Sequence, residues 1–269
     1  MFLDREKEGG FTRVLILASI LYLLVRLIIL LTSNSEVFFG CSRFIAAKLI
    51  LNKAKIGIAD LVCTPYEGGS LVHAFLGAFL MSLFGERYEV FSMLSLCYSI
   101  GFGVLLYYFM KIFFDKKAAV LSLILLALPP TFFTMCTLMV AGNITESCLL
   151  TLLIMFLLFK IIHSDRHGIF FYFIFGFVCG FSVWFHYVNL IVVVLSWAFL
   201  IRYKRKATFT KQFLIVYTVS FIIGFLPWIN YNMQHHFLGL NRFKDSFWDG
   251  DITVLNAIKN NLQTLSPAL

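Results

Sequence analysis

Residues 64–70, TPYEGGS, form the strongest turn signal in Ser33–Arg87, the first long polar interruption of an otherwise apolar chain. Phe11–Thr32, before this segment, is long and apolar enough to cross a membrane, and so are several stretches after it. Because Pro65 and the glycine pair that follows favour a reversal of the chain, we expect the segment to leave the bilayer and return to it. It is therefore predicted to be a loop of a membrane protein.

The composition supports this prediction. The chain is 60% hydrophobic and 17% aromatic, only 13% of its residues are charged, and its mean hydropathy is +0.88. Soluble domains contain roughly 25% charged residues. The net charge of +8 fits basic cytoplasmic loops better than nucleic-acid binding. We predict a single all-α polytopic membrane domain, residues 1–269, with the lipid bilayer as a partner and no nucleic acid.

About seven transmembrane helices are expected. The segments 118–162 and 168–201 are each too long for one crossing of about 20 residues, so each is predicted to fold as two spans. Their turns are expected near residues 141–143 and 185–187. The predicted organisation is a first span at 11–32, a long external loop with juxtamembrane helices at 33–88, spans two to seven within 89–231, and an external segment at 232–269.

The distribution of lysine and arginine sets the predicted orientation. We place the N-terminus in the cytoplasm and treat the apolar helix at 71–84 as one that does not cross. The basic loops then lie inside, and the short turns near 140–146 and 184–188, which hold no lysine or arginine, lie outside. A crossing helix at 71–84 would reverse every later loop. The expected location is the cell (plasma) membrane, with many passes.

Two further features concern the first span and the loop after it. Arg26 lies within the first span and is expected to extend its side chain toward the headgroups, with a phosphate contact as the alternative role. In the loop, apolar residues including Cys41, Ile45 and Leu49 recur at helical spacing. This pattern predicts a helix lying on the membrane with these residues facing the lipid and its lysines at the headgroups.

This topology gathers polar residues on the outer face. The candidates with binding or catalytic chemistry are Glu36, Glu67, Glu146, His186, Tyr231 and Asn232. For Glu146 a role as a helix-capping carboxylate is the alternative, and for His186 a structural role is the alternative. The six cysteines show no metal-ligand spacing, so no metal site is predicted from them.

Three stretches resemble the polyprenyl-phosphate-dependent GT-C glycosyltransferases, the superfamily of protein O-mannosyltransferases and aminoarabinose transferases. SEVFFG at 35–40 stands where that family has an Asp-Glu pair opening its first loop. LLYYFMKIFFDKKAAVLSLILLALPP at 105–130 is similar to its basic cytoplasmic turn and the span ended by proline. GFLPWINYN at 224–232 is similar to a G-x-x-P-x-x-x-Y-N motif. The resemblance extends over essentially the whole chain, as an N-terminal part of the family.

The resemblance implies inverting transfer of a sugar from a polyprenyl-phosphate donor to a lipid, glycan or protein acceptor on the outer face. Glu36 would deprotonate the acceptor hydroxyl, and Arg43, Lys55 or Arg87 would hold the leaving phosphate. Glu146 would help to hold the sugar or the acceptor. No cofactor is required by the pattern, although a divalent cation remains compatible with it.

Two alternatives stay open. The family usually has its catalytic Asp where this chain has Ser35, and members are longer, so a degenerate or truncated non-catalytic protein is one alternative. A membrane transporter is the other. It is less favoured because transporters place ionisable groups near the middle of the bilayer, whereas here nearly all polar groups lie at the predicted helix ends.

Overall fold

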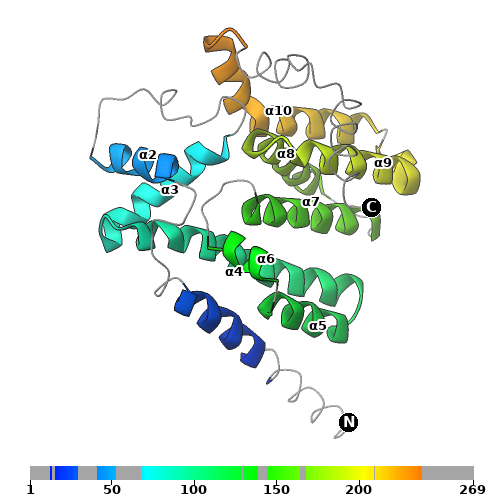
Figure 1. Cartoon of the computed structure of the whole chain (residues 1–269). Helices are drawn as coiled ribbons and strands as arrows, with labels where there is room; N and C mark the ends of the chain where they lie inside the picture. Colours follow the sequence, from blue (N-terminus) through cyan, green and yellow to red (C-terminus); the bar gives the residue numbers. More distant parts are fainter. Residues whose placement is uncertain are drawn as a thin grey trace, which may run out of the picture. The chain divides into compact units, whose positions relative to one another are not determined.

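A computed structural model describes residues 13, 16–29, 41–52, 68–128, 130–138, 144–163, 168–208 and 210–237 (Figure 1). The chain divides into two compact units, Met1–Pro227 and Trp228–Leu269, which are treated separately below. Every regular element within these residues is a helix, as the composition predicts.

The helices follow one another along the chain with short connections. Ile16–Ile29 comes first. It is followed by α2 (Cys41–Leu51), α3 (Gly69–Phe84), α4 (Tyr88–Phe113), α5 (Lys116–Ala127), α6 (Thr131–Cys136), α7 (Thr145–His163), α8 (Ile169–Phe185), α9 (Asn189–Thr208) and α10 (Lys211–Gln234).

Three of the described helices are long and apolar enough to cross a membrane, namely α4, α7 and α10. Ile16–Ile29, α3 and α8 are apolar but shorter, so their length alone does not assign them as spans. The structure thus agrees with a helical membrane protein, and the number of seven spans stays a prediction.

The turn predicted near 185–187 is present between α8 and α9. Helix α8 ends at Phe185 and α9 begins at Asn189. The Asn189 side-chain amide donates to the Ser182 carbonyl oxygen over 2.9 Å, and its backbone N–H donates to the His186 carbonyl oxygen over 3.0 Å. The Ser182 oxygen also accepts from the His186 N–H over 3.0 Å, so the Asn189 amide adds a second hydrogen bond at the end of α8.

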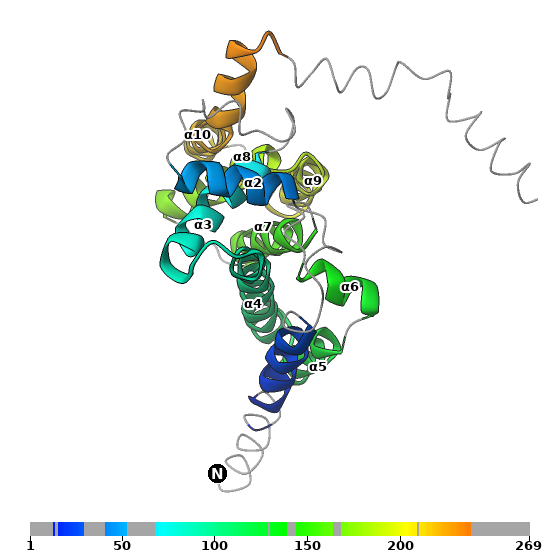
Figure 2. The ribbon, with the colours of Figure 1, turned by 60° about the vertical axis from the view of Figure 1, so that its left-hand side comes forward.

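The segment predicted as one span from residue 118 to about 140 is instead divided. Helix α5 stops at Ala127, and α6 is a separate short helix that begins at Thr131 (Figure 2). The physical reason is the proline pair at 129–130, since a proline has no N–H for the carbonyl four residues earlier. The Leu126 carbonyl oxygen therefore has no helical partner at position 130.

Arg26 supplies a donor to that carbonyl. One terminal nitrogen of Arg26 donates to the Leu126 oxygen over 3.2 Å, and the other donates to the Tyr22 oxygen over 3.3 Å. Its guanidinium carbon lies 3.6 Å from the Tyr22 ring centroid. The side chain is fully buried, so the expectation that it extends to the headgroups is wrong. Arg26 joins the first helix to the broken end of α5.

Helix α2 forms where helical spacing predicts it, but it packs through another face. Ala46 and Ala47 are buried against α3 and α4, whereas Ile45 is 54% exposed. Gly77 permits the close approach of α3 to α4, because a Cβ at this position would overlap the ring of Phe91 in α4. Lys48 pairs with Glu86 over 3.8 Å. Of the face predicted to meet lipid, Ile45 is exposed and Leu49 is partly buried beside Ala74 of α3, so α2 packs on protein mainly through its alanines.

Glycines bring α8 into backbone contact with the part of α10 that lies in the first unit. A Cβ at Gly180 would overlap the Phe221 carbonyl oxygen, and one at Gly224 would overlap the Phe177 carbonyl oxygen. Small residues commonly permit this close packing between membrane helices. The glycine of the GFLPWINYN stretch consequently has a packing role in this chain.

Candidate functional site

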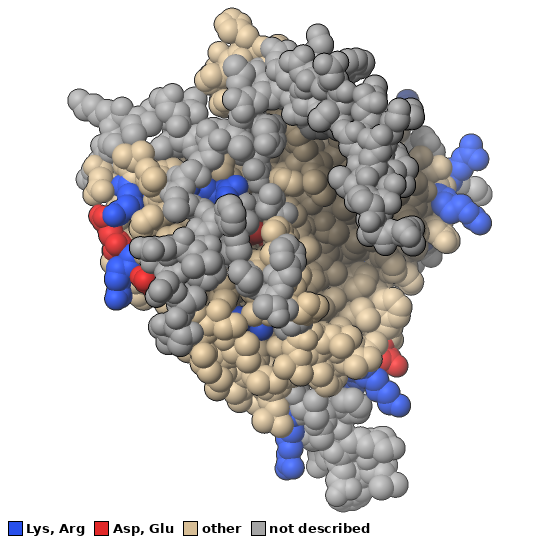
Figure 3. All heavy atoms as spheres, viewed as in Figure 1, with Lys and Arg blue, Asp and Glu red and all other residues tan. Residues whose placement is uncertain are grey.

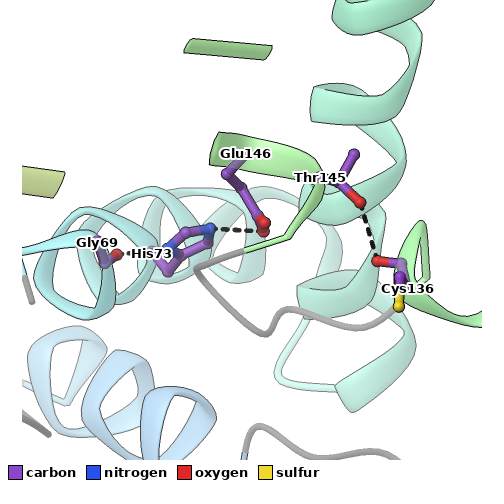
Figure 4. A network of polar contacts seen from close by, with 5 residues as sticks. All are labelled: Gly69, His73, Cys136, Thr145 and Glu146. Carbon is purple, nitrogen blue, oxygen red and sulfur yellow. Dashed lines mark hydrogen bonds and ion pairs between the residues drawn. The ribbon is translucent and has the colours of Figure 1, made fainter. Parts of the chain in front are cut away.

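A buried histidine and a buried glutamate meet where α3 and α7 begin. His73 Nε2 lies 3.0 Å from Glu146 Oε1, and the two side chains are 0% and 1% exposed. Figure 4 shows the two side chains pointing at each other, with the Gly69 carbonyl oxygen on the other side of the imidazole. This contact links residues 73 positions apart in the sequence.

The hydrogen-bond pattern determines how many protons the pair holds. A carbonyl oxygen can only accept, so His73 Nδ1 must carry a hydrogen and donate it to Gly69. The contact between Nε2 and Oε1 then contains one further proton, either on a charged imidazole facing a carboxylate or on a protonated Glu146 facing a neutral imidazole. In both forms the pair is neutral overall, and Glu146 Oε2 is an acceptor that carries no hydrogen.

Glu146 Oε2 has no hydrogen-bond partner among the described residues, although it is buried. A buried acceptor without a donor costs free energy, so it requires an explanation such as a bound water or another donor. The arrangement therefore offers one acceptor to a hydroxyl or ammonium donor.

Local packing fixes both ends of this pair. At the start of α7, the Thr145 hydroxyl donates to the Cys136 carbonyl oxygen over 3.0 Å (Figure 4). At the start of α3, the Gly68 N–H donates to the Trp184 carbonyl oxygen over 2.9 Å. Only glycine fits at this position, because a Cβ on residue 68 would overlap the Trp184 indole. The glycine pair predicted to turn the chain thus also docks α3 on the end of α8.

Aromatic rings surround the imidazole. The ring of Tyr98 in α4 lies 5.3 Å from the His73 ring, and that of Phe185 at the end of α8 lies 5.6 Å away. Four helices, α3, α4, α7 and α8, therefore contribute side chains to the buried surroundings of this polar pair. In such surroundings a hydrogen bond is stronger than in water.

The next residue after Phe185 is His186, another predicted site residue. Its side chain is half-buried in the turn before α9. Burial lowers the pKa of His186 below its ordinary value, and the positive charge of Arg43 on α2 lowers this pKa further. His186 is accordingly neutral at pH 7. The structure thus places Glu146, His186 and Arg43 around the same end of the first unit.

The other predicted residues are placed differently. Arg87 is exposed and precedes α4, about 17 Å along that helix from Tyr98. In the second unit Tyr231 stacks on His235 at 4.3 Å, and the buried Asn232 donates to the Trp228 carbonyl oxygen over 3.0 Å. Glu36, Lys55 and Glu67 lie outside the described residues.

Across the described ranges, no group of three or more His, Cys, Asp or Glu side chains is arranged to hold a metal ion. The divalent cation left open above has no complete ligand set within these residues.

Sequence reasoning missed His73. A signal was available, because His73 is the single ionisable residue in the apolar sequence of α3, GSLVHAFLGAFLMSLF. An ionisable residue in an apolar helix requires a partner, and such positions are functional candidates.

Comparison with known proteins supports the resemblance. No curated protein and no solved structure gives a significant match to this chain. Residues 68–231, which include α3 to α9 and most of α10, match the family described as dolichyl-phosphate-mannose-protein mannosyltransferase. The match starts at the glycine that docks α3 and includes both members of the His73–Glu146 pair. Since this region is more than half of the chain, the protein belongs to the dolichyl-phosphate-mannose-protein mannosyltransferase family of GT-C membrane glycosyltransferases.

Proposed function

We propose that the protein transfers a sugar from a polyprenyl-phosphate donor to a lipid, glycan or protein acceptor, with inversion at the anomeric carbon. The observation that carries this proposal is the family match over residues 68–231. The apolar helices α4, α7 and α10 support it, because they suit a protein that works on a lipid-linked substrate.

The reaction requires one carboxylate to accept a proton. The acceptor hydroxyl gives its proton to the base, its oxygen bonds to the anomeric carbon, and the bond from that carbon to the phosphate oxygen breaks. The polyprenyl phosphate leaves with the electron pair. Glu36 is the proposed base, at the mouth of the first predicted span.

Glu146 is unsuited to the role of base while its pair is intact. Its Oε1 already shares a proton with His73, and the pair is neutral as a whole. Its proposed role is recognition, in which Oε2 accepts a hydrogen bond from a hydroxyl of the sugar or the acceptor. His73 is then a positioning residue for Glu146.

Positive charge is needed where the phosphate departs. Arg43 is the described candidate on the His186 side of the site, and Lys55 is the candidate from the sequence. A neutral His186 would contribute hydrogen bonds instead of charge. Glu67, Arg87, Tyr231 and Asn232 remain further candidates for substrate contacts, with the site on the outer face and the N-terminus in the cytoplasm.

The test measures transfer of radiolabelled sugar from polyprenyl phosphate in membranes, starting with mannose because of the family description. Glu36→Gln should lower the rate about 10²- to 10⁴-fold, because a positioned proton acceptor is lost. Glu89→Gln is the matched control, since Glu89 is an exposed acid in the first turn of α4. Unchanged turnover in Glu36→Gln would remove Glu36 from the base role.

A non-catalytic role is favoured by one specific residue, Ser35, because serine cannot act as the base that the family has there. Ser35→Asp separates the two functions. We expect it to raise transfer above that of the unmodified chain if the protein is an enzyme. Background transfer in both proteins would favour the non-catalytic function.

A further inference from the structure

A cavity of about 300 Å³ lies between the Ile16–Ile29 helix, α4 and α5, away from the His73–Glu146 pair. This size is at the lower end of the range for ligand pockets. Its lining is almost wholly apolar and includes Ala18, Ser19, Tyr22, Gly103, Val104 and Tyr108. We call it the N-terminal slot.

Small residues create the hollow and larger ones form its walls. Ala18, Ser19 and Gly103 have little or no side chain, so the three helices leave space between them. Val104 is 52% exposed and Tyr108 51% exposed, so the slot is accessible from the surroundings of the helices. In a membrane protein, those surroundings are lipid chains.

Positive charge collects at one end of the slot. Lys111 Nζ lies 5.7 Å from the ring centroid of Tyr107, which also lines the slot. Arg13, Lys116 and Lys117 belong to the same end, because they precede the first helix and begin α5. Asp115, the one acid among the described residues at this end, accepts a hydrogen bond from the Ala118 N–H over 2.6 Å and so caps α5. Figure 3 shows lysine or arginine side chains, with an acidic one beside them, next to uncharged surface in the lower part of the view.

We propose that the N-terminal slot binds an anionic phospholipid of the surrounding bilayer. One acyl chain occupies the apolar space, and the phosphate lies among the basic side chains at the Lys111 end. Basic groups between membrane helices favour acidic headgroups. A zwitterionic lipid is disfavoured because its own cation would face four bases. Tyr107 and Tyr108 have rings that suit the boundary between chain and headgroup.

This site is separate from the proposed donor site. Tyr98, beside His73, and Lys111 are about 20 Å apart along α4. A phosphate held at Lys111 therefore cannot also lie beside Glu146. The proposal does not depend on the proposed function or on the orientation of the chain.

The test is native mass spectrometry of the purified full chain with equal amounts of phosphatidylglycerol and phosphatidylcholine that have identical acyl chains. We expect retention of one phosphatidylglycerol with at least about tenfold preference. Ser19→Phe should abolish retention by filling the slot, and Lys111→Gln with Lys117→Gln should remove the preference. Leu125→Phe, on the exposed face of α5, and Lys211→Gln, at the start of α10, are the matched controls.

The outcomes distinguish the occupants. Equal retention of both lipids, or retention that survives Ser19→Phe in a monodisperse protein, would overturn the proposal. Displacement of phosphatidylglycerol by an equal amount of polyprenyl phosphate would overturn it too, since the slot would then belong to the donor lipid. Sugar transfer is measured separately, so failure of the proposed function leaves this result unaffected.

Discussion

Two places in this protein bury an ionisable side chain among apolar helices, and they do so by different chemistry. At the start of α3 and α7, His73 meets Glu146, and the pair shares a proton. At the end of α5, Arg26 meets no described carboxylate and instead donates to the carbonyl oxygens of Tyr22 and Leu126. Both side chains of the pair and that of Arg26 are essentially inaccessible to solvent.

The difference shows that burial of a charge is a poor guide to function unless its partners are known. Arg26 uses its two terminal nitrogens on backbone groups, one of which Pro130 cannot satisfy, while its Nε has no hydrogen-bond partner among the described residues. The two terminal nitrogens therefore have a structural explanation. The Glu146 carboxyl leaves one oxygen without a donor among the described residues, so its explanation is incomplete without a further partner. Each place therefore leaves one buried polar atom without a described partner, and they differ in that Arg26 is held by backbone carbonyls whereas Glu146 is held by a side chain.

The largest expected loss of stability comes from removing one partner of the His73–Glu146 pair. Glu146→Ala should lower the free energy of unfolding by about 3–5 kcal/mol, because it leaves the buried His73 Nε2 without a partner. Thermal unfolding in detergent measures this loss. Glu146→Gln should cost less than about 1.5 kcal/mol, since its amide can donate to a neutral imidazole.

The matched control is the exposed pair of Lys48 and Glu86. Glu86→Ala should change the stability by only about 0–1 kcal/mol, as is usual for surface ion pairs. Replacing both buried partners, as His73→Phe with Glu146→Leu, should recover most of the stability lost in Glu146→Ala. A double variant as unstable as Glu146→Ala would show that the pair is not an independent polar unit.

A smaller loss of stability is expected at Arg26. Arg26→Leu should cost about 1–3 kcal/mol, because the Leu126 carbonyl loses its donor while the cost of burying a charge disappears. Adding Pro130→Ala should restore part of this loss, since residue 130 then has an N–H for that carbonyl. Additive losses in the double variant would refute the role of Arg26 as a substitute donor. Sugar transfer per folded molecule should be unchanged, unlike in Glu36→Gln.

Much of the fold could be predicted because it depends on local patterns. Apolar length and the positions of bases predicted α4, α7 and the turn after Phe185. The end of α5 at Ala127 agrees with the proline-ended span that the resemblance implies for 105–130, whereas apolar length alone extended this span to about residue 140. At α2 the periodicity located the exposed Ile45, but it did not show that Ala46 and Ala47 would be buried against α3 and α4. Periodicity locates an apolar face, but whether that face meets lipid or α3 depends on tertiary packing.

The candidate site was harder to predict from the sequence. Glu146 was identified from its place at an outer helix end, while its partner His73 was not. Nothing in the periodicity of α3 shows which residue of α7 it will contact, since that depends on how the intervening helices pack. The Arg26 contact with Leu126 crosses 100 positions for the same reason. Long-range polar contacts of this kind require the structure.

The smallest expected effect is on the pH dependence of stability, and it comes from His186, near the His73–Glu146 pair. Burial and Arg43 lower the pKa of His186, so the folded protein keeps this imidazole neutral at a pH where the unfolded chain starts to protonate it, near 6.5. The unfolded state then binds more protons, and stability is lost as the pH falls below about 6.5. His186→Gln removes this contribution, so its stability should fall less than that of the unmodified protein between about pH 7 and pH 5. Arg43→Gln should act in the same direction by weakening one cause of the lowered pKa of His186.

Thermal unfolding of the three proteins between about pH 7 and pH 5 measures how steeply stability depends on pH. The difference between the proteins should vanish at pH 8, where histidine is neutral in both states. Parallel curves at every pH would mean that the charge of His186 does not oppose folding, and the histidine would then be free to act as a cation beside the phosphate.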